Sequence, residues 1–137
     1  MGDTMDKIDR KIISELERNA REPFLQIAKR LDVSEGTIRK RVNDMVEKGI
    51  IRNFTINVSG NISAIVGIQT NPHVKTKDIV KELRKLNANK IFELTGRFDI
   101  LCFISAPSMI EANITLESIR SIEGILHTET FTVLSEE

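Results

Sequence analysis

Three adjacent cations, Arg39-Lys40-Arg41, lie inside a stretch whose apolar residues repeat at helical spacing. The positions i, i+4, i+7 and i+8 are Ile38, Val42, Met45 and Val46. This single apolar stripe predicts a helix, with Ser34 as its N-cap and Gly49 as the residue that ends it. Cations grouped on an exposed helix face suit the phosphates and base edges of a nucleic acid.

The segment before this helix predicts a shorter helix that packs against it. Its inner face is apolar at helical spacing: Ile27, Ala28 and Leu31. Pro23 fits the first turn, where a missing N–H has no cost, and Val33 fills the turn between the two helices. Phe24–Ile51 therefore predicts a helix-turn-helix, whose second helix enters a DNA major groove. The alternative is an ordinary small helical domain with basic outer faces.

Seven residues at the start of the second helix are the predicted DNA contacts: Ser34, Glu35, Gly36, Thr37, Arg39, Lys40 and Arg41. Those expected to approach base edges or nearby phosphates are Ser34, Gly36, Thr37 and Lys40. Gly36 permits a close backbone approach, and Arg39 and Arg41 are expected to clamp phosphates from the flanks. For Glu35 and Asn43, a solvated surface position is the competing interpretation.

A further amphipathic helix is predicted from about Asp3 to Arg18, with Thr4 or Asp3 as its cap. Its apolar positions are Met5, Ile8, Ile12, Ile13 and Leu16. It completes a three-helix unit over residues 1–52. A unit of about 50 residues is marginal by itself, because small domains bury too little surface. It is therefore expected to depend on the rest of the chain.

The composition is that of an ordinary soluble globular protein: 137 residues, 40% hydrophobic and 29% charged, with a formal net charge of zero. No apolar run approaches the ~20 residues of a membrane helix, and the charged N-terminus lacks the apolar stretch of a secretory signal. Cys102 is the single cysteine, so no disulfide forms within the chain, and a small buried hydrophobe is expected there. We expect a cytoplasmic protein without membrane contact.

The period of the pattern changes after the second helix. Residues 53–61 are predicted to form a linker made of a strand and a turn. Apolar Phe54, Ile56 and Val58 alternate with polar residues, as expected of a strand, and residues 59–61 read Ser-Gly-Asn, a turn signal.

Residues 62–137 predict six elements in the order β-α-β-β-α-β. Strands are expected at Ile62–Asn71, Lys90–Thr95, Ile100–Ala106 and Ile125–Leu134, and helices at Thr76–Leu86 and Ser108–Ser121. Thr76 is the expected cap of the first of these helices, and Ser108 with Glu111 has the spacing of a capping box. The second helix is expected to bury Met109, Ala112, Leu116 and Ile119. The order predicts an α+β, ferredoxin-like domain with both helices on one face of a four-stranded antiparallel sheet.

The strand Ile100–Ala106 is apolar on both sides, with Ile100, Cys102 and Ile104 facing one way and Leu101 and Phe103 the other. The two helices cover only one face of the sheet. A large exposed apolar patch usually marks an interface, so a homodimer with sheets packed face to face is expected. The alternative is that the N-terminal helices fold back over this face.

Four segments of the chain resemble one family. Residues 6–19 are similar to its opening helix, and Leu25–Thr55 is similar to its helix-turn-helix and linking strand. Glu93–Leu101 resembles its Thr-Gly-x-Tyr-Asp turn, with Phe98 in place of tyrosine, and residues 122–134 resemble its closing strand. The family is Lrp/AsnC, the feast/famine regulators. The linker between Val58 and Ile62 is several residues shorter than is usual in the family.

The resemblance implies a DNA-binding transcriptional regulator whose C-terminal domain serves assembly and amino-acid sensing. Its candidate effector site is the turn Gly96, Arg97, Phe98 and Asp99. Backbone N–H groups are exposed in such a turn, and Asp99 could meet an α-ammonium group. The alternative is structural: Gly96 supplies a positive φ, and Asp99 hydrogen-bonds the backbone of the turn. Phe98 lacks the hydroxyl that a tyrosine would offer a ligand.

The expected partners are double-stranded DNA, a second copy of the chain, and a free amino acid, with tetramers or octamers as further assemblies. A twofold dimer presents two recognition helices and so predicts a pseudo-palindromic operator. No cofactor or metal is expected.

Two other classes of protein compete with this interpretation. The first is an enzyme, either a haem-pathway decarboxylase or an acyl-phosphate hydrolase, built on the same fold. His73 and His127 are far apart in the sequence, and no metal-ligand cluster, phosphate loop or Ser/Cys–His pair is visible. The second is a partner regulator that forms mixed dimers without recognising DNA, and the basic cluster at residues 39–41 argues against it.

Overall fold

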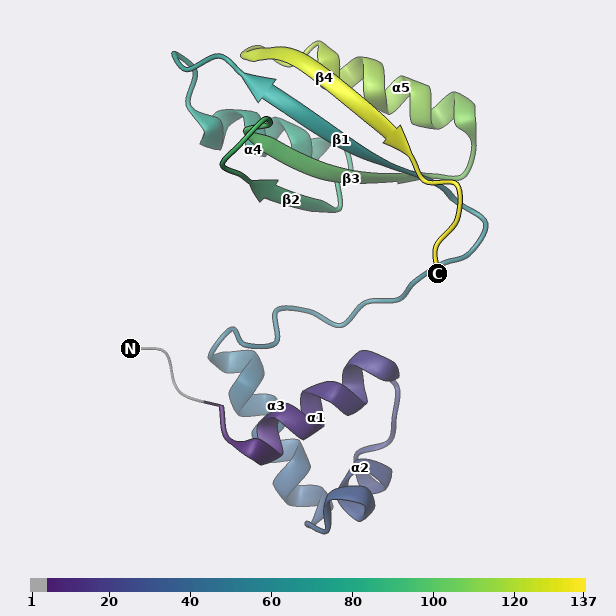
Figure 1. The fold of residues 1–137 in the computed structure, drawn as a ribbon. Helices are drawn as coiled ribbons and strands as arrows, with labels where there is room; N and C mark the ends of the chain where they lie inside the picture. The colour runs from purple at the N-terminus through teal and green to yellow at the C-terminus, as the bar shows by residue number, and fades with distance from the viewer. Residues whose placement is uncertain (1–4) are drawn as a thin grey trace. The chain divides into compact units, whose positions relative to one another are not determined.

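Residues 5–137 are described in the computed structural model, and they divide into two compact units between Asn57 and Val58. The first unit contains three helices, α1 (Lys7–Arg18), α2 (Phe24–Leu31) and α3 (Glu35–Glu47). The second contains a four-stranded sheet and two helices (Figure 1). No helix of residues 5–137 combines the length and the apolar composition needed to cross a membrane.

The first helix starts later than the sequence pattern predicts. Asp6 is the N-cap of α1: its carboxylate accepts from the Asp9 N–H at 2.8 Å, and the Asp9 carboxylate accepts from the Asp6 N–H at 3.4 Å. This reciprocal arrangement satisfies two N–H groups that a helix start leaves free, so the chain turns into the helix here. The predicted start at Asp3 was therefore wrong. The predicted caps, Asp3 and Thr4, lie outside the described residues.

Both ends of α3 are where the sequence predicts them. The Ser34 hydroxyl accepts from the Thr37 N–H at 3.1 Å, which confirms Ser34 as the N-cap. Gly49 adopts a φ of 72°, and the Ile50 N–H donates to the Met45 carbonyl at 2.9 Å. This is a Schellman ending, which needs a left-handed residue at the position of Gly49.

The core of the first unit is formed by one stripe from each helix. Its buried members are Ile12, Leu16, Ile27, Ala28, Ile38, Val42 and Met45. Val46, the last member of the predicted α3 stripe, is 44% exposed because it lies near the helix end, to one side of the contact with α1 and α2.

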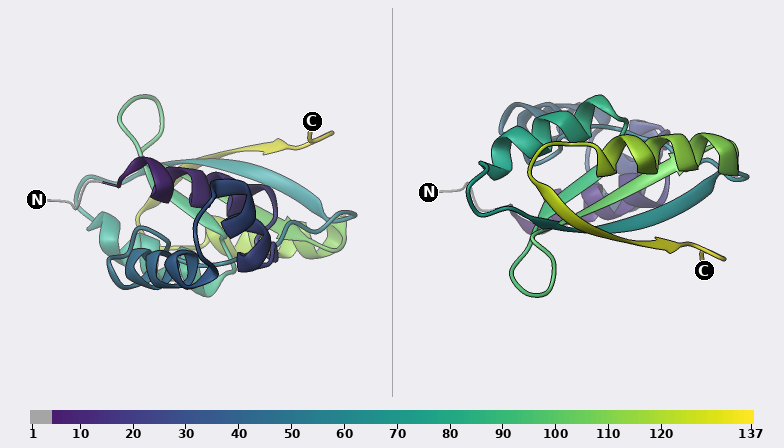
Figure 2. Two further views of the ribbon diagram at one scale, coloured as in Figure 1. Left: turned by 90° about the horizontal axis from the view of Figure 1, so that it is seen from below. Right: turned by 90° about the horizontal axis from the view of Figure 1, so that it is seen from above.

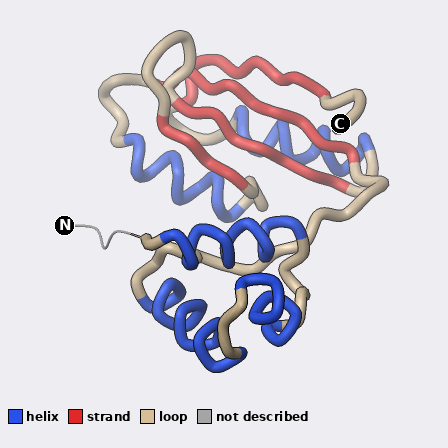
Figure 3. Tube along the Cα trace, turned by 60° about the horizontal axis from the view of Figure 1, so that its bottom comes forward, coloured by secondary structure: helices blue, strands red, loops and turns tan. Residues whose placement is uncertain are grey.

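The linker does not form the predicted strand. Residues 52–61 contain no strand or helix (tan segment in Figure 3), and Phe54, Ile56 and Val58 are 53%, 77% and 64% exposed. A strand requires a neighbour for its N–H and C=O groups, and no segment of residues 5–137 pairs with this one. The alternating pattern is present in the sequence, but alternation alone does not make a strand where no neighbouring segment of residues 5–137 accepts its hydrogen bonds.

The second unit confirms the ferredoxin-like order. Its strands are β1 (Ile62–Thr70), β2 (Lys90–Glu93), β3 (Ile100–Ala106) and β4 (Ile125–Thr132), and its helices are α4 (Thr76–Lys85) and α5 (Met109–Arg120). The sheet order is β2-β3-β1-β4 with every pair antiparallel. Both helices lie against the same face of the sheet, and the loop between β2 and β3 projects on the opposite side (Figure 2).

The helix starts and the buried face of α5 differ in part from the sequence predictions. Thr76 is the first residue of α4 and not its cap, because Lys75 occupies the N-cap position and no side chain caps the helix. Ser108 is the N-cap of α5, as predicted, and its hydroxyl accepts from the Glu111 N–H at 3.3 Å. Met109 is 48% exposed and not buried, because the stripe that meets the sheet is centred on Ala112 and Ile119.

Candidate nucleic-acid interface

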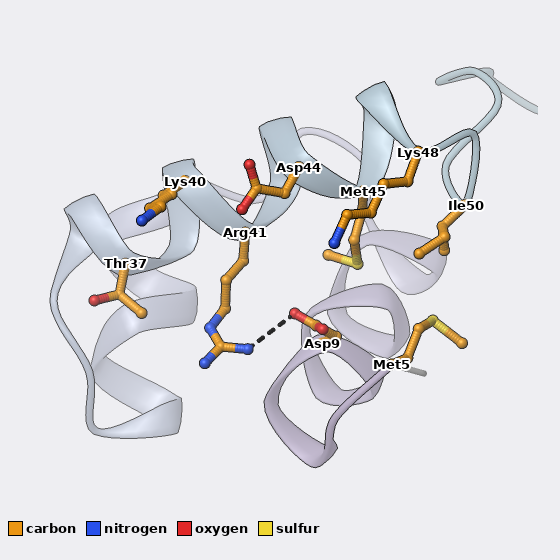
Figure 4. Close-up of a pocket in the computed structure, with 9 residues that line it drawn as sticks. All are labelled: Met5, Asp9, Thr37, Lys40, Arg41, Asp44, Met45, Lys48 and Ile50. Atoms are coloured by element: carbon orange, nitrogen blue, oxygen red, sulfur yellow. Dashed lines mark hydrogen bonds and ion pairs between the residues drawn. The ribbon is translucent and has the colours of Figure 1, made fainter. Parts of the chain in front are cut away.

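The exposed side of α3 carries a lysine that no other side chain holds. Lys40 is exposed and makes no hydrogen bond or ion pair with any residue of 5–137. In Figure 4 its ammonium group points away from Asp9 of α1. The opposite side of the helix is buried through Ile38, Val42 and Met45. Packing on that side fixes the position of α3, and the Lys40 side chain stays free to contact a ligand.

Arg39 lies beside Lys40 but is held by two neighbours. Its guanidinium forms an ion pair with Glu35 at 2.8 Å, one helical turn earlier. Its ζ carbon also lies 5.3 Å from the centre of the Phe24 ring at the start of α2. A guanidinium over an aromatic face is attracted by the ring's negative charge density, so Phe24 and Glu35 together restrict where Arg39 points.

The first turn of α3 is pre-ordered by Ser34 and Thr37, whose hydroxyl oxygens lie 2.8 Å apart. Gly36, between them, is exposed, and a Cβ atom built on it would meet only the Ser34 hydroxyl oxygen, at 3.9 Å. The surface at Gly36 is therefore open to the close approach of another molecule.

Arg41 differs from its two neighbours because it points toward α1. Its guanidinium pairs with Asp6 and, at 3.1 Å, with Asp9 (Figure 4). The Asp9 N–H and then Arg41 lower the pKa of the Asp6 carboxyl below its ordinary value of 3.8. The same two carboxylates raise the pKa of Arg41. The sequence predicts a phosphate clamp here, whereas the structure places this guanidinium between two carboxylates that hold α3 on α1.

A depression of about 450 Å³ lies between α1 and α3 (Figure 4). Its lining residues are Met5, Asp9, Thr37, Lys40, Arg41, Asp44, Met45, Lys48 and Ile50. Carboxylates and cations alternate around it, so it does not favour a ligand of one charge. Its chemistry is that of a helix–helix contact bordering the exposed Lys40.

In the second unit, the turn Gly96–Asp99 is fastened to the outer face of the sheet. One Asp99 carboxylate oxygen accepts from the Thr70 N–H at 2.8 Å and from the Thr70 hydroxyl at 3.3 Å. The Asp99 N–H donates to the Ile68 carbonyl at 2.9 Å, and Gly96 has a φ of 126°. These contacts match the structural interpretation of the turn, in which Asp99 binds backbone and Gly96 supplies the positive φ.

Three further side chains, those of Arg97, Gln69 and Phe98, close this turn onto strands β1 and β4. The Arg97 guanidinium lies 3.1 Å from a Glu129 carboxylate oxygen, and the Gln69 side-chain amide donates to the Arg97 carbonyl at 3.1 Å. The Phe98 ring lies directly over Gly67, where a Cβ atom would be 2.8 Å from three ring carbons. The space that Gly67 leaves is thus filled by the aromatic ring of the turn.

The structure shows several site residues that the sequence pattern did not indicate. These are Asp6, Asp9, Phe24, Gly67, Thr70 and Glu129. Each contacts its partner across a gap of 15 to 35 residues, and local periodicity contains no signal at that range. Neither His73 nor His127 is buried, and residues 5–137 contain no group of three His, Cys, Asp or Glu side chains able to hold a metal ion.

Comparisons with known proteins agree with both units. A family described as winged helix-turn-helix DNA-binding matches residues 5–52, and the Lrp/AsnC ligand-binding domain matches residues 63–137. The chain is 38% identical over 133 residues to the HTH-type transcriptional regulator LysM of Sulfurisphaera tokodaii, a match that covers 95% of each chain.

Two solved structures have the same fold. AsnC of Escherichia coli superimposes with a TM-score of 0.75 at 28% identity, over 97% of this chain and 94% of that one. A transcriptional regulator of Neisseria meningitidis, solved as a complex with L-methionine, has a TM-score of 0.79 at 24% identity, over 97% and 92% of the two chains.

Proposed function

Because the chain belongs to the Lrp/AsnC family of DNA-binding transcriptional regulators, we propose that α3 is its recognition helix and that Lys40 reads the operator. The observation that supports this most directly is the exposed, unpaired Lys40 on a helix whose opposite face is fully packed. The protein would act in the cytoplasm, where duplex DNA is accessible. The named relatives are transcriptional regulators, and their names do not describe enzymes.

The contacts in the first unit support a division of roles along α3. Lys40, with Gly36 and Thr37 one turn earlier, approaches base edges or nearby phosphates, and Ser34 caps the helix beside them. Arg39, held by Phe24 and Glu35, contacts a phosphate. Arg41 acts indirectly, because its ion pairs with Asp6 and Asp9 fix the angle between α3 and α1.

A homodimer would deliver two recognition helices to one duplex. The outer face of the sheet supports this, because it exposes Phe92 (46%) and Phe131 (47%) and half-buries Ile65, Leu101 and Phe103. Such a patch marks an interface. Two symmetry-related helices require a pseudo-palindromic operator with half-sites one helical turn, about 34–36 Å, apart, or a multiple of that spacing. Tetramers or octamers of such dimers would extend the same contact to longer DNA.

A free amino acid is the proposed effector, and the turn Gly96–Asp99 is its proposed site. Support comes from the neighbour that was solved with L-methionine and from the Lrp/AsnC ligand-binding domain that matches residues 63–137. Asp99 is committed to Thr70 through one of its oxygens, so a ligand would meet a turn that is already ordered. Calorimetry against each of the amino acids tests this, and the absence of binding would remove the sensor and leave the DNA proposal intact.

Selection of bound duplexes from a random pool tests the DNA proposal. We expect recovered sequences with twofold symmetry and a weakening of about 1–3 kcal/mol for Lys40→Ala in gel-shift titration at fixed salt. Lys11→Ala, an exposed lysine of α1, is the matched control and should bind as the wild type does. Equal affinity of Lys40→Ala and wild type would refute the role of Lys40. Failure to recover any duplex would favour the partner regulator that does not recognise DNA.

A further inference from the structure

The second unit has a strongly uneven charge distribution. Residues 75–90, which contain α4, carry six lysines and arginines and two carboxylates, whereas the rest of residues 58–137 carries two arginines and eight carboxylates. A unit whose other charged residues are mainly acidic therefore has one basic element. The two arginines elsewhere, Arg97 and Arg120, are each engaged by a glutamate.

Three of these cations form a stripe along the exposed side of α4. Lys77, Lys81 and Arg84 follow the spacing i, i+4 and i+7, and Lys81 lies roughly 180° around the helix from the buried Ile79 and Leu83. All three are exposed, and none makes a hydrogen bond or ion pair with residues 5–137. Lys85, at the edge of the stripe, is instead paired with Glu82 at 2.8 Å. The helix is one of the two that cover one face of the sheet (Figure 2).

Helix stability does not account for this stripe. Lys77 lies in the first turn of α4, where the helix dipole disfavours a cation. Lys77 and Lys81 are also like charges at i and i+4, and such pairs destabilise a helix. Only Arg84, in the last turn, is placed favourably for the dipole. The stripe therefore lowers the stability of the isolated helix, and an anionic partner would offset that.

We propose that the Lys77–Lys81–Arg84 stripe is a second DNA-contacting surface that binds the phosphate backbone without reading sequence. The inference rests on the proposed function of α3. From Lys77 to Arg84 the helix rises about 10 Å, and a duplex strand presents a phosphate about every 3.4 Å along its axis, so three cations face about three phosphates.

The linker keeps such DNA within reach. Residues 52–61 are an exposed chain without regular structure, and ten extended residues span at most about 35 Å, close to one helical turn of DNA. Once α3 binds an operator, the local concentration of duplex around α4 becomes high, so weak contacts suffice. The stripe would then contribute affinity and salt dependence, while sequence preference would remain with α3.

The test is the salt dependence of binding by the full-length chain. The stripe variant is Lys77→Gln with Lys81→Gln and Arg84→Gln, and glutamine keeps a good helix propensity. The control variant is Lys75→Gln with Lys85→Gln and Arg120→Gln, which removes the same charge outside the stripe. Circular dichroism verifies that both variants are folded. The probes are a labelled duplex recovered by selection and a random-sequence duplex of the same length.

For the stripe variant we expect the slope of log affinity against log salt to fall in magnitude by about 2–3 for each chain bound, since each lost phosphate contact contributes about 0.9. Affinity at low salt should fall at least tenfold for both probes, with their ratio unchanged. The charge-retaining variant Lys77→Arg with Lys81→Arg and Arg84→Lys should keep the wild-type slope.

Each contrary outcome has a distinct meaning. A stripe variant with the wild-type slope, or with no larger change than the control variant, overturns the inference while the DNA proposal stands. If the stripe variant binds DNA normally but no longer self-associates, the stripe contacts an acidic surface of a second copy of the chain. That result also overturns the inference. A wild-type chain that binds neither duplex overturns the inference together with the proposed function.

Discussion

The guanidinium of Arg41 on α3 lies 3.1 Å from the Asp9 carboxylate on α1, and the same guanidinium pairs with Asp6, the N-cap of α1. The cap of one helix and the orientation of another are thus maintained by one cluster. The most basic part of the predicted recognition helix is therefore not uniformly available to DNA, because one of its three cations serves the protein itself.

We predict that Arg41→Met lowers the thermal midpoint of the first unit, because it removes the cation that holds α3 on α1. Arg18→Met is the matched control, since the Arg18 side chain is 66% exposed and pairs with Glu15 of its own helix, and ion pairs of an exposed cation contribute little. Thermal melts followed by circular dichroism compare the two. Equal midpoints for Arg41→Met and the control would show that the cluster does not stabilise the unit.

The cluster of Arg41, Asp6 and Asp9 predicts that the stability of the first unit falls at acid pH. Folding lowers the pKa of Asp6 below its ordinary 3.8, so the ionised carboxyl contributes stability above that pH. The contribution is lost as the pH falls through the lower folded value. Urea midpoints measured from neutral pH downward should show a steeper acid decline for the wild type than for Asp6→Asn. Parallel declines would contradict this.

The contact of Arg39 with the Phe24 ring predicts a coupled pair. Phe24→Leu keeps an apolar side chain but removes the aromatic face, so Arg39 should lose about 0.5–1 kcal/mol of interaction. In a double-mutant cycle with Arg39→Gln, read out as DNA affinity, the two losses should not add. Strict additivity would mean that Phe24 does not position Arg39 for DNA.

Gly67 is required by its contact with Phe98 and not by its backbone conformation. We predict that Gly67→Ala destabilises the second unit by about 1–3 kcal/mol, because its Cβ would lie 2.8 Å from the ring. Combining it with Phe98→Leu should restore part of the loss. Gly36→Ala is the control, because that site is open and alanine is the better helix former. Chemical denaturation measures the free energy of unfolding of Gly67→Ala, of its combination with Phe98→Leu, and of Gly36→Ala. An unchanged free energy of unfolding for Gly67→Ala would mean that the Phe98 ring is free to move.

Cys102 is predicted to be unreactive while the protein is folded. It is fully buried, and burial raises the pKa of its thiol from 9.0 to about 11. At pH about 8 the thiolate fraction is then roughly 100-fold smaller than for a free cysteine, so alkylation by iodoacetamide should slow by at least that factor. The raised pKa also predicts a contribution to stability that is lost as the pH rises from about 9 to about 11. Rapid alkylation of the native protein would contradict the burial.

The sequence by itself determined the local features of this protein. Periodicity indicates every helix and the four strands of the sheet, because a helix or a half-buried strand repeats its apolar residues at its own period. The caps Ser34 and Ser108 and the helix-ending Gly49 are equally local, because each acts within a few residues. The exposure of Lys40 follows from the stripe opposite it.

The tertiary structure alone decided which polar groups meet. Arg41 and Asp9 are 32 residues apart in the sequence, and Asp99 and Thr70 are 29 residues apart. A pattern of neighbouring residues does not indicate contacts over such separations. The prediction of a linker strand was wrong for the same reason: the alternation is visible in the sequence, but no segment of residues 5–137 lies beside it to form a ladder. Whether a segment forms a helix or a strand depends mainly on residues close to it in the sequence. Which group pairs with a guanidinium or with the edge of a strand depends on how whole helices and strands pack together.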